Sequence, residues 1–371
     1  MTRHCIAVAA GGTGGHFFPA EALACELVRR GHDIILMTDR RAGMRETGVF
    51  AGRQQFVLPG AGIAGRGIIR AARAAVALGR GVMQARGILS RIRPSAIIGF
   101  GGYPSVPPLL GGSLLPKGRR PLLFIHEGNA VLGKANAFLA PRMNGIATSF
   151  PVVAGVPEGI PATLTGMPVR PDIAALAGEG YAPSNGVINL LVWGGSLGAR
   201  VFSDVVPPAL AALSPALRAR VQVTQQARAE DVERVRAAYR AAGIPAMIAP
   251  FLDNVPDRLR AAHLVIGRAG GSSVAELAVA GRPSLLVPLP IAARDEQGAN
   301  AQALCDAHAA WMIRQPDFTA PALTQRLTEL LADRDLLART AQAAAALGRP
   351  DAAARLADMI EARLPDLPRT A

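Results

Sequence analysis

Gly11-Gly12-Thr13-Gly14-Gly15-His16 follows the apolar run Ile6–Ala10, and half a chain later Gly194-Gly195-Ser196-Leu197-Gly198 follows the apolar run Val187–Trp193. Each run predicts a β-strand, and each glycine-rich turn leads from that strand into a predicted helix. Glycine leaves the backbone N–H groups at such a helix start open to an anionic phosphate, and ligands of open α/β sheets bind at the carboxyl ends of the strands. The repeated pattern predicts two similar halves with a ligand bound between them.

Strands and helices alternate in both halves, which is typical of doubly wound parallel sheets. The further predicted strands are His32–Thr38, Gln55–Leu58, Ser95–Phe100, Pro121–His126 and Gly145–Phe150, then Arg220–Thr224, Ala246–Phe251, His263–Gly267 and Pro283–Pro288. Helices are predicted to begin at Pro19 and to cover Glu230–Ala242 and Leu337–Leu364, the last with a weak break signal at Arg349-Pro350. The proline- and glycine-rich run Pro151–Pro171 is expected to connect the two domains.

The composition narrows the class of protein. With 371 residues, half of them hydrophobic, the chain can bury two domain cores. Its formal charge of +13 comes almost wholly from arginine, and aromatic residues are scarce at 4%, so we expect no nucleic-acid partner. Three cysteines without metal-binding spacing indicate a reducing compartment. Asp333-Arg334-Asp335 is typical of a helix start, and we expect no metal site.

One basic stretch is a candidate membrane contact. The uncharged run Pro94–Pro116 is long enough to span a bilayer, but its prolines and glycines would break a helix, so any membrane contact is expected to be peripheral. The candidate contact residues interleave apolar and arginine side chains, and they are Ile69, Arg70, Arg73, Val76 and Arg80. This pattern fits a helix lying on anionic lipid, or a helix packed on its own sheet with its arginines in solvent.

The first glycine-rich turn is not a dinucleotide-binding fingerprint. Phe17 stands where that motif needs its third glycine, although Asp39 ends the second strand as the motif's acidic residue would. His16 directly follows the turn, where an imidazole can accept a proton or can simply hold the loop. His126 and Glu127 end the fifth strand, and Asn129 and Asn136 follow them; polar groups at such a strand end favour a site.

In the second half, Arg268-Ala269-Gly270-Gly271-Ser272-Ser273 ends a strand and opens a helix that carries Glu276. The loop offers N–H donors to phosphate, and the carboxylate can accept the two hydroxyls of a ribose. A capping box between Ser273 and Glu276 is the alternative interpretation. Asp295, Glu296, Gln297 and Asn300 follow the next strand at the same edge and are candidates for sugar contacts.

Six blocks in chain order resemble the MurG family of glycosyltransferases. They are Gly-Gly-Thr-Gly-Gly-His at 11–16, Gly-Gly-Tyr-Pro-Ser at 101–105, His-Glu-Gly-Asn at 126–129 with Asn136, Gly-Met-Pro-Val-Arg at 166–170, Gly-Gly-Ser-Leu-Gly-Ala at 194–199, and Arg-Ala-Gly-Gly-Ser-Ser-Val-Ala-Glu at 268–276. The chain departs from the usual pattern at Gly128, at Thr224–Ala227 and at Glu296.

The resemblance implies the GT-B fold, in which two Rossmann-like, doubly wound parallel-sheet domains of the α/β class face a cleft. It implies an acceptor- and membrane-binding domain over 1–164, joined by the terminal helix at about 347–371, and a UDP-sugar-binding domain over 165–346. The partners it implies are the donor UDP-N-acetylglucosamine, the undecaprenyl-linked acceptor lipid I, the anionic surface of the inner membrane and other cell-wall synthesis proteins. The implied location is peripheral, on the cytoplasmic face of the bacterial inner membrane.

Residue roles follow from the resemblance by position. Glu276 would hold the uridine ribose, Leu252 the uracil through its backbone, and Ser196 and Arg170 the phosphates. The remaining donor contacts would be Gly12, Thr13, Gly14, Asn129, Gly271, Ser272, Ser273 and Gln297.

The implied reaction is an inverting attack by the 4-hydroxyl of the muramoyl sugar, without a cofactor. His16 is the candidate base, with Glu127 or His126 as rivals, and helix N-termini with Arg170 or Arg268 would stabilise the departing UDP. Another glycolipid glycosyltransferase or a UDP-N-acetylglucosamine 2-epimerase would share the fold, and a catalytically silent nucleotide-sugar or membrane-binding protein is a further alternative.

Overall fold

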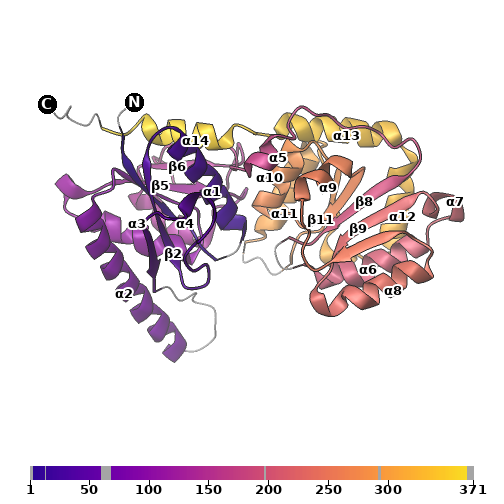
Figure 1. Ribbon diagram of the computed structural model, residues 1–371, viewed down its shortest axis with the longest axis horizontal. Coiled ribbons are helices and arrows are strands. Elements are labelled where there is room, and N and C mark those ends of the chain that lie inside the picture. The colour runs from indigo at the N-terminus through magenta and orange to yellow at the C-terminus, as the bar shows by residue number, and fades with distance from the viewer. Residues whose placement is uncertain (1–2, 13, 60–67, 196–197, 291–293, 366–371) are drawn as a thin grey trace. The chain divides into compact units, whose positions relative to one another are not determined.

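The computed structural model describes residues 3–12, 14–59, 68–195, 198–290 and 294–365 (Figure 1). The chain forms two compact units. The first contains the residues up to Arg170 together with those from Asp351 onward, and the second is Pro171–Pro350. The boundary therefore falls after Arg170, where the sequence placed it after residue 164.

The N-terminal unit is built on a seven-stranded sheet of order β3-β2-β1-β4-β5-β6-β7, in which every paired strand is parallel. Strands β1 and β4 are apolar on both faces: Ile6 and Ile98 on one face and Ala7 and Ile97 on the other have no exposed surface. Helices cover both sides of such a sheet, which explains the continuous apolar runs. The elements are β1 (Cys5–Ala9), α1 (Gly14–Arg29), β2 (Asp33–Asp39), β3 (Gln55–Leu58), α2 (Ile68–Ile92), β4 (Ala96–Gly99), α3 (Val106–Ser113), β5 (Leu122–Glu127), α4 (Lys134–Leu139), β6 (Gly145–Thr148), β7 (Ala162–Leu164) and α14 (Ala352–Glu361).

The C-terminal unit repeats this topology with a six-stranded parallel sheet of order β10-β9-β8-β11-β12-β13. Its elements are α5 (Pro171–Ala174), β8 (Ile188–Trp193), α6 (Arg200–Ala211), α7 (Pro215–Arg218), β9 (Val221–Gln226), α8 (Val232–Ala241), β10 (Ala246–Ala249), α9 (Val255–Ala261), β11 (Leu264–Gly267), α10 (Gly271–Val279), β12 (Ser284–Leu286), α11 (Glu296–Asp306), β13 (Trp311–Met312), α12 (Ala320–Ala332) and α13 (Arg334–Leu347). The prediction of two Rossmann-like parallel sheets is confirmed. In each unit the strand order reverses beside the first strand, and ligands of such sheets bind at that point.

Three predictions about elements were wrong. Helix α1 begins at Gly14 and contains Pro19, because the two glycines ahead of the proline already take up helical geometry. The sequence missed the short strands β7 and β13, which lie at the sheet edges. The predicted helix over Leu337–Leu364 is two helices, because Gly348 ends α13 with extended backbone and Pro350 disfavours helix in the residue before it. The break falls at the boundary between the units.

The two faces of the N-terminal sheet carry different helices (Figure 1). Helices α1 and α14 pack on one face through Leu23, Leu27, Leu356 and Ile360. Helices α2, α3 and α4 cover the other face, in a core that includes Leu89 and Leu109. The last helix of the chain is therefore part of the core of the N-terminal unit.

Arg30 ties α14 to α1. Its Nη1 donates to Asp358 at 2.6 Å and to Glu361 at 2.5 Å, while Nη2 donates to the Ala354 carbonyl at 3.1 Å. The Arg30 side chain, directly after α1, is only 12% exposed and also pairs with Glu26 of α1. We expect Arg30→Ala to lower the free energy of unfolding of this unit by about 2 kcal/mol, because carboxylates that are partly shielded from water lose their cation.

Thermal unfolding of the full chain measures this effect. The matched control is Arg29→Ala, since Arg29 also pairs with Glu26 but is 70% exposed and forms no hydrogen bond or ion pair with α14 among the described residues. We expect the control to leave the unfolding temperature nearly unchanged. Equal losses in the two variants would contradict a specific role for Arg30 at α14.

Candidate functional site

His16 lies in the first turn of α1, at the carboxyl end of β1. Its ring rests against Gly101 and Gly102, which follow the neighbouring strand β4; a Cβ added at either glycine would lie 3.5 Å from ring atoms of His16. Both glycines have positive φ, 80° and 66°, a conformation that side chains other than glycine rarely adopt. The glycine pair therefore packs against the imidazole ring of His16. The sequence had not predicted this contact. The sequence feature that could have predicted this contact is the pair of glycines directly after a predicted strand.

The surroundings of His16 keep its ring neutral. Burial lowers its pKa below the ordinary value of 6.5, and the opposing influences are the negative charge of Glu127 and a hydrogen bond that the ring donates to the Phe100 backbone. A neutral imidazole that donates from one nitrogen has a lone pair on the other. At neutral pH the ring can therefore accept a proton.

Glu127 is fully engaged by its own loop. Its Oε1 accepts the backbone N–H of Asn129 and the side-chain amide of Asn129, both at 3.0 Å. Its Oε2 accepts the Gly133 N–H and the Asn136 amide, both at 2.8 Å. Four hydrogen bonds occupy the lone-pair sites of a carboxylate. The geometry therefore favours Glu127 as a positioning residue and a fixed negative charge near His16, and it does not favour Glu127 as the proton acceptor.

His126 is equally committed to the fold. It is 2% exposed, its Nε2 lies 3.0 Å from the Gly166 carbonyl, and its ring packs on Phe100 with 5.3 Å between centroids. Burial lowers the pKa of His126 to about 4, outweighing the hydrogen bond to Gly166. Nε2 must carry the ring proton to bond a carbonyl, so this histidine holds the segment that contains Gly166 against β5.

The remaining predicted residues of the first half gather at the same edge. Gly12 has a φ of 78°, and its N–H reaches Asp39 at 3.4 Å; Asp39 also accepts from Ala42 at 3.1 Å. The acid at the end of β2 therefore shapes the glycine-rich turn. Arg170 belongs to this unit and lies with its guanidinium 5.2 Å from the ring centroid of Phe18, whereas the sequence placed Arg170 in the second domain. Thr13 lies outside the described residues.

In the C-terminal unit the turn after β8 is tightly closed. A Cβ on Gly194 would lie 2.5 Å from the Ala199 nitrogen, and Gly195 and Gly198 have φ values of 80° and 67°. Only glycine fits such a turn without moving the backbone. Ser196 lies outside the described residues.

Helix α10 begins in the second candidate loop. Gly270 is its N-cap and has no side-chain capping bond, so Gly271, Ser272 and Ser273 form the first turn and Glu276, 4% exposed, lies deeper in the helix. The capping-box interpretation is wrong, because Ser273 is inside the helix and is not its cap. The first N–H groups of a helix have no partner within the helix, and they give this end a positive potential.

Two predicted ligand contacts instead support this loop. Asn300, fully buried, donates to the Ala269 carbonyl at 2.9 Å. Arg268 donates to the carbonyls of Val287 and Pro288 and to Gln315, and burial lowers its pKa to about 10. Its guanidinium therefore connects the ends of β11 and β12.

Other candidates lie along the same edge. Gln297 accepts the Leu289 N–H at 3.0 Å, and Asp295, in left-handed backbone ahead of α11, pairs with Arg314 at 2.6 Å. Leu252 is 5% exposed and lies between β10 and α9, a helix that contacts β8. Within the described residues no cluster of three or more His, Cys, Asp or Glu side chains has metal-binding geometry.

Two Rossmann-type units, each with a glycine-rich turn and a helix start at the carboxyl edge of its sheet, form the architecture of the GT-B class of nucleotide-sugar enzymes. Family models agree: residues 6–148 match the glycosyltransferase family 28 N-terminal domain, and residues 189–356 match the family 28 C-terminal domain.

Curated relatives narrow the family. A protein of Gluconobacter oxydans, named UDP-N-acetylglucosamine--N-acetylmuramyl-(pentapeptide) pyrophosphoryl-undecaprenol N-acetylglucosamine transferase, is 62% identical over 97% of this chain and 98% of its own length. A protein of the same name from Granulibacter bethesdensis is 58% identical over 97% of this chain and 94% of its own length. The crystal structure of Acinetobacter baumannii MurG superposes with a TM-score of 0.78 at 28% identity, covering 97% of this chain and all of that one. The chain belongs to the MurG family of family 28 glycosyltransferases.

One structural neighbour bears on the alternative activity. A UDP-N-acetylglucosamine 2-epimerase structure from Listeria monocytogenes has a TM-score of 0.68 at 14% identity, over all of this chain and 98% of that one. At this identity the likeness shows the fold alone.

Proposed function

We propose that the chain transfers N-acetylglucosamine from UDP-N-acetylglucosamine to the 4-hydroxyl of the muramoyl sugar of lipid I, forming lipid II of peptidoglycan. The observation that best supports the proposal is the neutral His16 ring, packed against Gly101 and Gly102 at the carboxyl edge of the first sheet. The relatives named for this transfer, matched over nearly the whole chain, support the choice of substrates.

The donor binds mainly to the C-terminal unit in this proposal. The first turn of α10, Gly271–Ser273, meets the sugar nucleotide, and the Glu276 carboxylate accepts the ribose hydroxyls. The Leu252 backbone meets the uracil. Further donor contacts come from Gln297 and Ser196 and, in the N-terminal unit, from Gly12, Thr13, Gly14, Asn129 and Arg170.

The reaction is a single displacement with inversion. His16 accepts the proton of the 4-hydroxyl as that oxygen forms a bond to the anomeric carbon, and the bond from this carbon to the UDP oxygen breaks with its electron pair leaving on UDP. Helix N-termini and Arg170 stabilise the new charge on UDP. The negative charge of Glu127 stabilises the imidazolium that forms.

An acceptor-dependence assay tests the proposal. The purified chain is incubated with UDP-N-acetylglucosamine, with and without a lipid I analogue, and both UDP and the lipid product are measured. We expect UDP and a disaccharide lipid in equal amounts, and only with acceptor present. UDP release with 2-epimerised sugar in the absence of acceptor would instead establish the epimerase, and UDP binding without turnover would support the catalytically silent alternative.

We propose that α2 attaches the protein to the anionic cytoplasmic face of the inner membrane. Between residues 47 and 157 the sequence has thirteen Lys and Arg and one acidic residue, the buried Glu127. Helix α2 packs on its sheet through Ile88 and Leu89, yet it also exposes Val76 (56%) and Met83 (58%) on the face that carries the exposed Arg73 and Arg80. The buried face accounts for the packing of α2 on its sheet, and the exposed basic and apolar face is the one that we propose lies on lipid. The side chains of Ile69 and Arg70 lie outside those described.

No helix among the described residues has the length and apolarity needed to cross a bilayer. Contact with lipid would therefore come from exposed side chains on surfaces such as α2. Other cell-wall synthesis proteins would meet the chain at the same membrane surface.

We expect Arg73→Gln with Arg80→Gln to weaken binding to vesicles containing anionic lipid about thirtyfold, because each arginine near such a surface contributes about 1 kcal/mol. Sedimentation with vesicles at low and high salt measures the effect. The matched control is Arg240→Gln with Arg258→Gln, two exposed arginines of the C-terminal unit. Binding by the wild-type chain that is insensitive to salt would contradict the electrostatic attachment.

A further inference from the structure

Two arginines lie on neighbouring aromatic rings of α1. The guanidinium of Arg45 lies 3.8 Å from the ring centroid of Phe17, and that of Arg170 lies 5.2 Å from the ring centroid of Phe18. The face of an aromatic ring attracts a cation placed over it. Arg45 comes from the connection between β2 and β3, whereas Arg170 ends the first segment of the N-terminal unit, so only the fold brings both arginines to one helix.

Glu21 lies between these two rings on the surface of α1. It follows Phe18 by three residues and Phe17 by four, and residues at both spacings are neighbours on one helix face. Burial raises the pKa of the Glu21 carboxyl above its ordinary value, and the positive charges of Arg45 and Arg170 oppose this rise. Both guanidinium groups therefore act on the same carboxylate.

The connection that carries Arg45 is fixed beside Glu21. The Arg45 N–H donates to Oε1 of Gln55 at 2.7 Å, and the Arg45 carbonyl accepts from Nε2 of Gln55 at 2.8 Å. A Cβ built on Gly48 would collide with Oε1 of Glu21, and Gly48 has a φ of 74°, which favours glycine. The backbone of this connection therefore packs against the Glu21 carboxylate.

The Phe18 ring places Arg170 next to the first glycine-rich turn. A Cβ added at Gly14 would lie 2.7 Å from Cε2 of Phe18, so the ring packs against the first residue of α1. Arg170 lies over this ring, and in the proposed reaction it stabilises the charge that develops on UDP. The orientation of Arg170 therefore depends on the side chains of α1 that surround its guanidinium.

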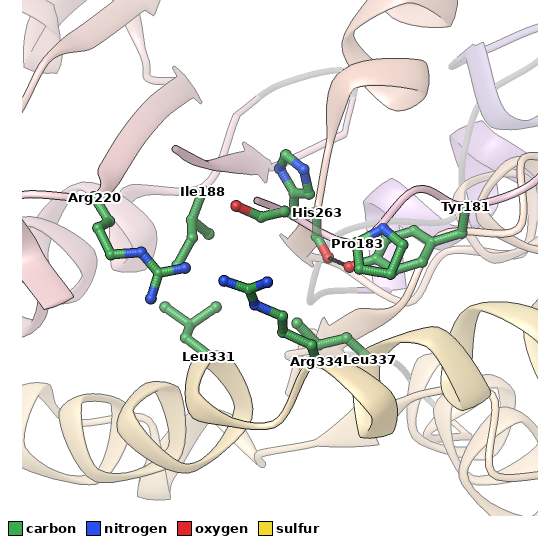
Figure 2. Close-up of a pocket in the computed structure, with 9 residues that line it drawn as sticks. Tyr181, Pro183, Ile188, Arg220, His263, Leu331, Arg334 and Leu337 are labelled. Carbon is green, nitrogen blue, oxygen red and sulfur yellow. Dashed lines mark hydrogen bonds between the residues drawn. The ribbon is translucent and has the colours of Figure 1, made fainter. Parts of the chain in front are cut away.

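A second pair of arginines meets in the C-terminal unit, where Arg220 and Arg334 reach into one hollow (Figure 2). The hollow has room for about one water molecule, and none of the residues that line it is acidic. It lies where β8, β9 and β11 begin, whereas the donor candidates lie where these strands end. This pair has no place in the transfer, and the pair on α1 is the one that shares a carboxylate.

We propose that Glu21 is a positioning residue, whose charge keeps Arg170 on the Phe18 ring in the orientation that meets the diphosphate of the donor. This role rests on the proposed transfer from UDP-N-acetylglucosamine. Glu21 touches neither the substrate nor the reacting atoms. Two guanidinium groups repel each other, and a carboxylate between them attracts both, so without this charge Arg170 loses its orientation.

Calorimetric titration with UDP, and with uridine in competition with UDP, tests this role because only UDP carries the diphosphate. We expect Glu21→Gln to weaken UDP binding about fivefold, the usual upper limit for a partly exposed charge pair, and to leave uridine binding unchanged. Arg170→Gln should weaken UDP binding further. The matched control is Glu46→Gln, an exposed carboxylate next to Arg45 in the chain, which should leave both affinities unchanged.

A double variant separates positioning from a general effect of charge. If Glu21 acts through Arg170, adding Glu21→Gln to Arg170→Gln should cause no further loss of UDP affinity. An equal loss in both backgrounds, unchanged UDP binding by Glu21→Gln, or tighter UDP binding by this variant would overturn the role. Thermal unfolding of each variant without ligand checks that the fold is intact.

The wild-type chain distinguishes a failure of this role from a failure of the proposed function. Wild type that prefers UDP to uridine, together with an unaffected Glu21→Gln variant, would overturn the role of Glu21 alone. Wild type that binds UDP no more tightly than uridine would overturn the diphosphate contact and the role of Glu21 with it. Neither result depends on transfer to the lipid acceptor, which the acceptor-dependence assay measures separately.

Discussion

Replacing His16 with Ala is expected to reduce kcat of the transfer about 10²–10⁴-fold, the usual contribution of a positioned general base. The physical reason is that burial lowers the pKa of His16 below 6.5, so the ring is neutral and able to accept the hydroxyl proton at neutral pH. Single-turnover transfer to a lipid I analogue at saturating donor measures the effect. UDP affinity should be unchanged, because the proposed donor site lies mainly on the other unit.

The pH profile separates a base from a merely structural histidine. A base must be unprotonated, so activity falls as pH drops through its pKa. Because that pKa is lowered, the acid limb of the wild-type profile should lie below pH 6.5. In His16→Ala that limb should disappear from the residual activity. Turnover that survives the substitution with its acid limb intact would rule out His16 as the base.

Replacing Glu276 with Gln is expected to raise the KM for UDP-N-acetylglucosamine about 10–100-fold, with a smaller effect on kcat. A hydrogen bond to a charged group contributes about 1.5–3 kcal/mol, and the carboxylate is proposed to accept from the ribose hydroxyls. The isosteric amide avoids leaving a cavity at a residue that is 4% exposed. Steady-state kinetics with donor varied gives the split between KM and kcat.

A donor that lacks the ribose 2′-hydroxyl sharpens the test for Glu276. Wild type should lose affinity for it, whereas Glu276→Gln should discriminate much less, because the interaction is already gone. The control is Glu329→Gln, an exposed carboxylate on α12 of the same unit, which should behave as wild type. Full discrimination by the Glu276 variant would show that this carboxylate does not touch the ribose.

Much of the fold could be predicted because its signals are local. Strands buried on both faces read as continuous apolar runs, as in β1 and β11, and the two glycine-rich turns mark where helices follow them. The failures came where a local signal competed with packing. Pro19 suggested a helix start, yet α1 begins at Gly14, and the edge strands β7 and β13 are too short to show a period.

The sequence could predict which loops form the candidate site, but not which role each of their side chains has. Sequence reasoning could place His16, His126 and Glu127 at one sheet edge, but it left all three open as the base. The structure separates them by their partners: Glu127 accepts four hydrogen bonds, His126 bonds Gly166, and His16 rests on two glycines. Likewise the start of α10 at Gly271 excludes the capping box between Ser273 and Glu276.

Residue type and spacing were enough to predict two doubly wound parallel-sheet domains with glycine-rich turns at their sheet edges, because hydrophobic periodicity and glycine act over a few neighbouring residues. The resemblance to one glycosyltransferase family rested on six motif blocks in chain order. The fold was needed to show which polar groups are engaged by hydrogen bonds and that Arg170 belongs to the first unit. Burial and hydrogen-bond partners set these properties, and they arise between residues far apart in the chain.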